Sequence, residues 1–237
     1  MNLFQELKEK FRTGDILTRL LLINCAMFVL ILLLDITFTL ITFGTEKFAE
    51  QLFQFPWNPL TLAFRPWTVI TAMFTSHGLW HLLFNMFTLY WLGGIFLQYY
   101  TSNHLRGLYV LGAIAGMALF TATFMLFPGF AFKDWSATIP LASVSILTFC
   151  TALAFRAPNH QEQIPLIGPV KLKYIIIILG VIDAALIPSI NPASDAAHLG
   201  GVLTGWLFYR LLVKGRDLTA PVTAVAIWLY GLFNKNR

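Results

Sequence analysis

Charged residues are scarce in this sequence. Only 11% of its 237 residues are Asp, Glu, Lys or Arg, whereas 57% are hydrophobic. An ordinary soluble domain carries about 25% charged residues, so the composition excludes that class and indicates an integral membrane protein in contact with the lipid bilayer. The basic residues stand at the ends of apolar runs and form no stripe interleaved with aromatic residues, so we expect no nucleic-acid partner despite the net charge of +5.

Cysteine is nearly absent as well. The two cysteines, Cys25 and Cys150, lie within apolar runs and lack the spacing of a disulfide framework or of a C-x-x-C metal site. The sequence therefore excludes a disulfide-stabilised protein and a metal site of the C-x-x-C type. We expect the two thiols to be unreactive residues of the core.

Long apolar runs, by contrast, are abundant. A helix needs about 20 residues to cross the hydrocarbon core of a bilayer. The sequence predicts six spans, at residues 16–43, 79–99, 107–127, 139–155, 174–187 and 196–212. We expect an amphipathic segment at the membrane surface over residues 1–15, a membrane domain over 16–213 and a tail over 214–237. The apolar piece of the tail, residues 220–233, is expected to be peripheral rather than a seventh span.

The basic residues predict the orientation of these spans. Six spans place both termini, the connection between spans two and three, and the connection between spans four and five on one side. Thirteen Lys and Arg residues belong to that side, at positions 8, 10, 12, 19, 106, 156, 171, 173, 210, 214, 216, 235 and 237. The other side carries three, Lys47, Arg65 and Lys133. The positive-inside rule therefore predicts a multi-pass protein of the cell membrane with cytoplasmic N- and C-termini.

Residues 44–76 form a long connection that does not span the membrane. Its Trp57 and Trp67 belong to a residue type that gathers at the membrane–water boundary, so we expect this connection to lie partly in the headgroup layer. Within the first span, Asn24 and Asp35 are expected to face protein or that boundary, because isolated polar groups in lipid are costly.

The predicted second span has a polar face. With 3.6 residues per turn, His77, His81 and Asn85 lie on the same side of a helix. A single polar residue within a membrane often only joins helices, whereas three in register indicate a functional site. His77 is nearer the aqueous edge, and we expect it to support the adjoining loop by hydrogen bonding.

A serine and a histidine near the starts of two other spans extend this candidate site. Ser143 opens the fourth span and His198 the sixth. A neutral imidazole activates a serine hydroxyl by removing its proton, which predicts hydrolytic chemistry if the two helices touch. Ser145 is a rival nucleophile, but two residues along a helix rotate it by roughly 200° from Ser143. Small residues on the sixth span favour close helix contact; they are Gly200, Gly201 and Gly205.

Attack by a serine on a carbonyl creates an oxyanion that needs hydrogen-bond donors sheltered from bulk water. His81 and Asn85 are expected to supply an imidazole N–H and an amide NH₂. The backbone N–H of Ser143, at a helix start where it lacks an intrahelical acceptor, adds a third donor.

Two carboxylates stand near these residues. Asp195 precedes His198 by one helical turn and can orient it, although capping of the sixth helix by Ser194 or Asp195 is the commoner role. Asp183 lies within the fifth span, where an ionisable residue is a functional candidate by default. We expect Asp183 to make only a packing contact.

Two motifs combine the candidate residues: His81-Leu-Leu-Phe-Asn85-Met followed by Gly93-Gly94, and Ala197-His198-Leu-Gly200-Gly201. Together they resemble the signatures of the rhomboid intramembrane serine proteases. The resemblance covers roughly residues 16–213 and implies an all-α, polytopic six-transmembrane-helix bundle of rhomboid type.

The resemblance also implies roles for individual residues. Ser143 would be the nucleophile, His198 the general base, and His81 with Asn85 the oxyanion site. Substrates would be transmembrane segments of other membrane proteins, cleaved at or just inside the bilayer edge. Neither a metal nor an organic cofactor is implied.

One position departs from the family pattern. Rhomboid proteases usually have Gly-x-Ser-Gly around the nucleophile, whereas this chain has Leu141-Ala-Ser143-Val144. Glycine leaves room for the backbone beside the oxyanion, so we expect Leu141 to crowd or reshape the site. This feature favours an alternative function, a catalytically weak or inactive rhomboid-like protein that binds transmembrane clients.

Two further alternatives have less support. A metal-dependent membrane protease can use His77 and His81 at helical spacing, but zinc proteases with that spacing have Glu after the first histidine, and here the residue is Gly78. A transporter fits the composition. The sequence, however, has no pair of interrupted helices in matching halves to indicate one.

Overall fold

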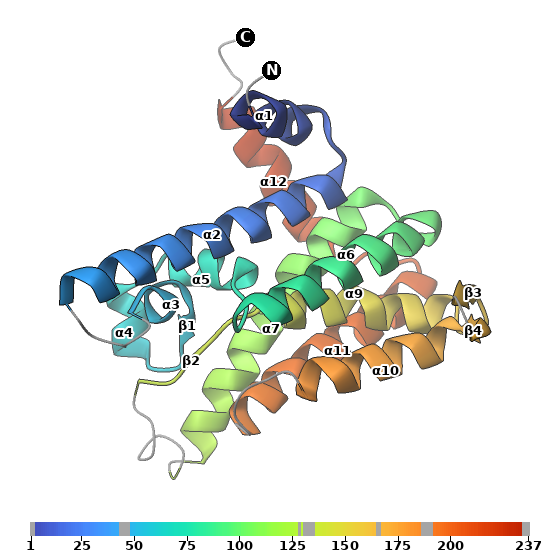
Figure 1. Ribbon diagram of the computed structural model, residues 1–237. Coiled ribbons are helices and arrows are strands. Elements are labelled where there is room, and N and C mark those ends of the chain that lie inside the picture. Colours follow the sequence, from blue (N-terminus) through green and yellow to red (C-terminus); the bar gives the residue numbers. More distant parts are fainter. Residues whose placement is uncertain are drawn as a thin grey trace.

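The computed structural model describes residues 3–42, 48–127, 129, 136–164, 167–185 and 192–233. Its helices form a bundle (Figure 1), which confirms the predicted all-α polytopic class. The helical elements are α1 (Leu3–Thr13), α2 (Ile16–Thr42), α3 (Phe48–Phe53), α4 (Pro59–Phe64), α5 (Thr68–Thr71), the 3-10 turn η1 (Ala72–Phe74), α6 (Leu79–Tyr99), α7 (Ser102–Leu126), α9 (Ala142–Arg156), α10 (Leu172–Ala185), α11 (Pro192–Val213) and α12 (Ala220–Phe233).

Four of the described helices are long and apolar enough to cross a membrane: α2, α6, α7 and α11. The helices at the predicted fourth and fifth spans are shorter, since α9 has 15 residues and α10 has 14. Residues 186 and 187 at the end of the predicted fifth span lie outside the described residues, as does Lys133 in the turn after the third span. Helix α12 has 14 residues, below the length of a span.

Two small antiparallel sheets interrupt the helical pattern. Strand β1 (Phe55–Pro56) pairs with β2 (Thr138–Ile139), and β3 (Gln161–Ile164) forms a hairpin with β4 (Gly168–Lys171). The two sheets lie at opposite ends of the bundle (Figure 1). The predicted start of the fourth span at Ile139 is wrong, because this residue lies in β2 and α9 begins only at Ala142.

Helix α9 is central to the bundle. It contacts α6, α7, α10 and α11, and most of its side chains are buried. The predicted glycine contact is present between α9 and α11. A Cβ atom at Gly201 would lie 2.8 Å from the carbonyl oxygen of Val144, and one at Gly205 would meet the carbonyl oxygen of Thr148. The backbones of α9 and α11 are therefore in close contact, and a side chain at either glycine would prevent this approach.

The connection between α2 and α6 is folded onto the bundle. Trp57 is only 7% exposed and its ring stacks on Phe124 at a centroid distance of 4.9 Å. Trp57 therefore packs inside the protein, whereas Trp67 is 43% exposed. Asn24 and Asp35 face protein as predicted: Asn24 Nδ2 donates to the Tyr109 hydroxyl at 3.0 Å, and Asp35 accepts a backbone N–H from α3.

The two cysteines differ in their surroundings. Cys150 is a buried residue of α9, as predicted, but Cys25 lies on the exposed face of α2. Its assignment to the core is wrong, because α2 is a peripheral helix with few buried side chains.

Candidate active site

Ser143 lies in the first turn of α9, and the segment before α6 holds this turn in place. The backbone N–H of Leu141 donates to the carbonyl of Ala72 at 2.8 Å, and that of Ala142 donates to the carbonyl of Thr75 at 3.3 Å. Ser143 is 4% exposed. Its own N–H belongs to the first turn, where helical N–H groups have no intrahelical acceptor.

The start of α9 accommodates a leucine at position 141. Its backbone has φ −122° and ψ 6°, a conformation open to residues with a side chain, so glycine is not required here. The side chain is fully buried and packs towards α7, where a Cβ at Gly116 would lie 3.2 Å from its Cδ2 atom. Gly116 thus provides the space that the leucine fills.

His198 faces Ser143 from the neighbouring helix α11. The Nε2 atom of His198 lies 3.0 Å from Ser143 Oγ, and Nδ1 lies 2.9 Å from the carbonyl oxygen of Ser194. Because a carbonyl only accepts hydrogen bonds, Nδ1 carries the proton of a neutral ring, which assigns Nε2 as the acceptor for the serine hydroxyl. This arrangement can activate Ser143.

The start of α11 differs from the prediction. The helix begins at Pro192, so Ser194 and Asp195 lie within its first turn instead of capping it. Proline is favoured at this place because its missing N–H needs no partner there. Asp195 is exposed, and His198 is oriented by the Ser194 carbonyl.

The polar face of α6 lies opposite these two residues. The backbone N–H of His77 donates to His81 Nδ1 at 3.1 Å, and the two rings stack with centroids 5.6 Å apart. Asn85 Nδ2 donates to Ser76 Oγ at 3.1 Å, which leaves its second N–H for another acceptor. Gly78, with φ +89°, makes the turn from this loop into α6.

Asp183 is the residue that sequence reasoning missed. Its Oδ1 lies 2.9 Å from His81 Nε2 and its Oδ2 lies 3.2 Å from His198 Nε2. The expectation of a packing contact is therefore wrong. The signal was present in the sequence, since a carboxylate within an apolar span is a functional candidate, but nothing in it indicated that α10 turns this residue towards both histidines.

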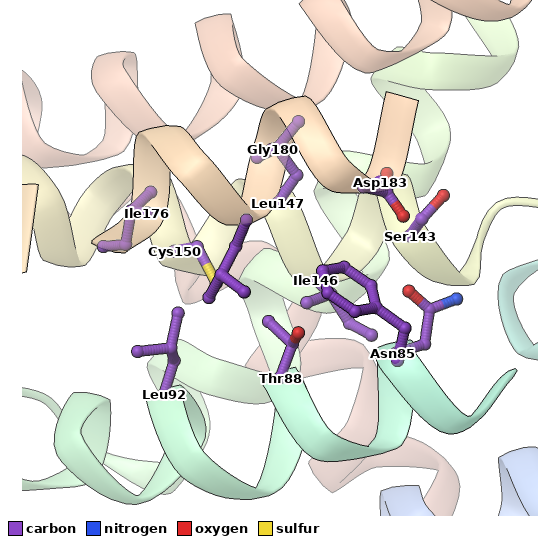
Figure 2. A pocket seen from close by; sticks show the side chains of 12 residues that line it. Asn85, Thr88, Leu92, Ser143, Ile146, Leu147, Cys150, Ile176, Gly180 and Asp183 are labelled. Atoms are coloured by element: carbon purple, nitrogen blue, oxygen red, sulfur yellow. The ribbon is translucent and has the colours of Figure 1, made fainter. Parts of the chain in front are cut away.

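A narrow pocket runs from the polar groups into the bundle (Figure 2). Asp183, Ser143 and Asn85 lie at one end, while Leu92, Ile176 and other apolar side chains line the rest. A buried polar end beside an apolar channel is a site from which bulk water is limited.

Of the two serines on α9, only Ser143 is within hydrogen-bond distance of His198. Ser145 is fully buried, and its Oγ has no hydrogen-bond partner among the described residues. The geometry thus combines a serine hydroxyl, an imidazole acceptor, amide and backbone donors, and a carboxylate. Together these groups can carry out acyl transfer through a covalent intermediate.

Comparison with known protein families matches residues 63–215 to the Rhomboid domain. The match spans well over half of the chain and includes every residue of the site described above. Among curated proteins, the chain has no match.

Proposed function

Since the chain belongs to the rhomboid family, we propose that it is an intramembrane serine endopeptidase with Ser143 as nucleophile and His198 as general base. The observation that carries this proposal is the 3.0 Å separation of Ser143 Oγ and His198 Nε2, with the opposite ring nitrogen held by a carbonyl. A serine and an imidazole on different helices, with this tautomer, match what nucleophilic catalysis requires.

The proposed reaction proceeds in two stages. Ser143 Oγ attacks the scissile carbonyl carbon while its proton moves to His198 Nε2, and the carbonyl π electrons become an oxyanion. When the C–N bond breaks, His198 returns the proton to the leaving amine. A water molecule, activated by the same imidazole, then hydrolyses the ester formed on Ser143.

Donors for the oxyanion are available on two elements. Asn85 has an N–H that is not used by Ser76, and the Ser143 N–H lies at a helix start. His81 is the third proposed donor, but its Nε2–H is directed to Asp183 in this structure. It therefore has to change partner to reach an oxyanion. His77 supports this site through the hydrogen bond to His81.

The proposed substrates are transmembrane segments of other proteins. The pocket beside Ser143 is largely apolar, and the helical bundle lies in a membrane. A substrate segment would therefore reach the pocket from lipid as a helix, because its backbone groups have no other hydrogen-bond partners there. Its backbone must be unwound before the hydroxyl can attack a carbonyl. We therefore expect preferred substrates to contain Gly or Ala near the outer end of the span, where the helix is weaker.

The decisive experiment uses detergent-purified protein and a generic transmembrane reporter. Wild-type protein should cleave the reporter and be labelled by a serine-directed fluorophosphonate. Ser143→Ala and His198→Ala should each abolish turnover while the fold persists. Ser145→Ala is the matched control on the same helix, and it should keep activity.

A second candidate function, the binding of transmembrane clients without cleavage, was favoured by Leu141. The packing of Leu141 against α7 weakens that support. Absence of labelling and cleavage in well-folded wild-type protein would nevertheless favour the binding function over the protease.

A further inference from the structure

Asp183 lies between the two histidines of the site. It comes from α10, whereas His81 comes from α6 and His198 from α11, so one carboxylate joins three helices. The exposed fractions of the three side chains are 9% for Asp183, 2% for His81 and 15% for His198. A carboxylate so well shielded from water interacts strongly with the charges that develop beside it.

The hydrogen bonds of His81 fix the position of its proton. Its Nδ1 accepts the backbone N–H of His77, so the proton of a neutral ring is on Nε2 and is donated to Asp183 Oδ1. His81 has no other N–H. While this bond holds, the ring is oriented but has no hydrogen to offer to an oxyanion.

The interaction of Asp183 with His198 changes from repulsion to attraction during the proposed reaction. In neutral His198, Nδ1–H donates to Ser194 and Nε2 has only a lone pair, which a carboxylate oxygen at 3.2 Å repels. Once Nε2 takes the proton of Ser143, the same oxygen faces an N⁺–H group and attracts it. Asp183 therefore stabilises the state after proton transfer more than the state before it, which is the condition for accelerating a step.

We propose that Asp183 is a positioning residue that couples the two histidines during acylation. Its Oδ1 holds His81 in the resting site, and its Oδ2 stabilises the imidazolium of His198. Formation of the imidazolium draws the carboxylate towards His198, which frees the His81 N–H for the oxyanion that forms in the same step. This inference rests on the proposed protease function.

The test compares variants that separate charge from shape. Asp183→Asn keeps the size and an acceptor for His81 but removes the charge, and Asp183→Glu keeps the charge one methylene further from the backbone. We expect Asp183→Asn to lower kcat for a transmembrane reporter roughly 100-fold, with KM nearly unchanged. This is the scale of the loss when one electrostatic partner of a transition state is removed. The kcat of Asp183→Glu should be higher than that of Asp183→Asn. Ile175→Val, a buried change on the same helix without polar contacts, is the control.

A double-mutant cycle tests the coupling itself. If Asp183 acts partly through His81, the kcat of Asp183→Asn/His81→Ala should fall less than the product of the two single effects predicts. Fluorophosphonate labelling should slow in Asp183→Asn as well, because labelling needs the same proton transfer.

The outcomes distinguish this inference from the protease proposal. If wild-type protein neither cleaves nor is labelled, the proposed function fails before any Asp183 variant is compared. If wild-type protein is active and Asp183→Asn has the same kcat, only the role of Asp183 is overturned. The same holds if the kcat of Asp183→Glu is no higher than that of Asp183→Asn. Independent effects in the double-mutant cycle would overturn the coupling to His81.

Discussion

Among the described residues, the contact of Ser194 with the site is made by its backbone carbonyl, and this carbonyl determines which nitrogen of His198 faces Ser143. Because every residue has such a carbonyl, the sequence could not reveal its role. The same applies to Ala72 and Thr75, whose carbonyls hold the start of α9. At the scale of single residues, much of the positioning in this protein is done by groups that have no side-chain signature.

Substitution of Ser194 tests this role of the backbone. Ser194→Ala should leave reporter cleavage essentially unchanged, because the carbonyl remains. It should also leave thermal stability unchanged or slightly higher, since the residue lies inside a helix that begins at Pro192 and Ala is the better helix former. A loss of about 1 kcal/mol on thermal unfolding in detergent would instead identify Ser194 as a helix cap.

Leu141 provides a second test at this scale. Leu141→Gly restores the usual family residue, but it should not increase cleavage, because the leucine side chain packs on Gly116. It should destabilise the protein by about 2–5 kcal/mol, the cost of deleting a buried leucine side chain. Leu141→Met conserves volume and should cost less than about 1.5 kcal/mol. Higher cleavage per folded molecule in the glycine variant would show that Leu141 does obstruct the site.

The candidate residues that could be found from the sequence share one property, which is regular spacing or a recognisable motif. His81 and Asn85 are one turn apart on α6, and His198 is followed by a pair of glycines. Asp183 has no such pattern. Its position depends on how α10 packs beside α6 and α9, and this tertiary arrangement does not follow from the residues around it.

At the scale of elements, the long helices were predictable and the short strands were not. The predicted second span, residues 79–99, matches α6, because a run of apolar residues bounded by polar turns determines a helix in lipid. Strands β1 and β2 have two residues each, too few for an alternating pattern. Their pairing joins segments more than 80 residues apart, which local sequence does not encode.

The contact between α9 and α11 brings Ser143 and His198 together, and Gly205 tests it. Gly205→Ala places a methyl group against the backbone carbonyl of Thr148, so we expect a loss of about 1–3 kcal/mol on thermal unfolding and slower fluorophosphonate labelling. Gly94→Ala is the matched control, because a Cβ there meets no atom within 4 Å. It should stabilise α6 by about 0.5–1 kcal/mol. Equal effects of the two variants would contradict close helix contact as the basis of the site.

At the scale of the whole molecule, the fold and the charge distribution have to agree on an orientation. The hairpin β3–β4 and the segment from α3 to β1 lie at opposite ends of the bundle (Figure 1). The two residues before Ser143, Leu141 and Ala142, donate backbone hydrogen bonds to Ala72 in η1 and to Thr75 directly after it, and η1 follows the segment from α3 to β1 in the chain. If the basic side of the chain is cytoplasmic, the proposed active site opens towards the outer leaflet.

Two glutamines make this orientation measurable. Gln51 in α3 and Gln163 in β3 are both exposed and lie at the two ends of the bundle. In a parent protein with Cys25 and Cys150 replaced by alanine, Gln51→Cys should react with a membrane-impermeant maleimide in intact cells. Gln163→Cys should react only after lysis, because the positive-inside rule predicts that the side with thirteen basic residues is cytoplasmic. The reverse labelling pattern would show the opposite orientation. Labelling of both residues in intact cells would mean an even number of membrane crossings between them, against the three spans predicted at residues 79–99, 107–127 and 139–155.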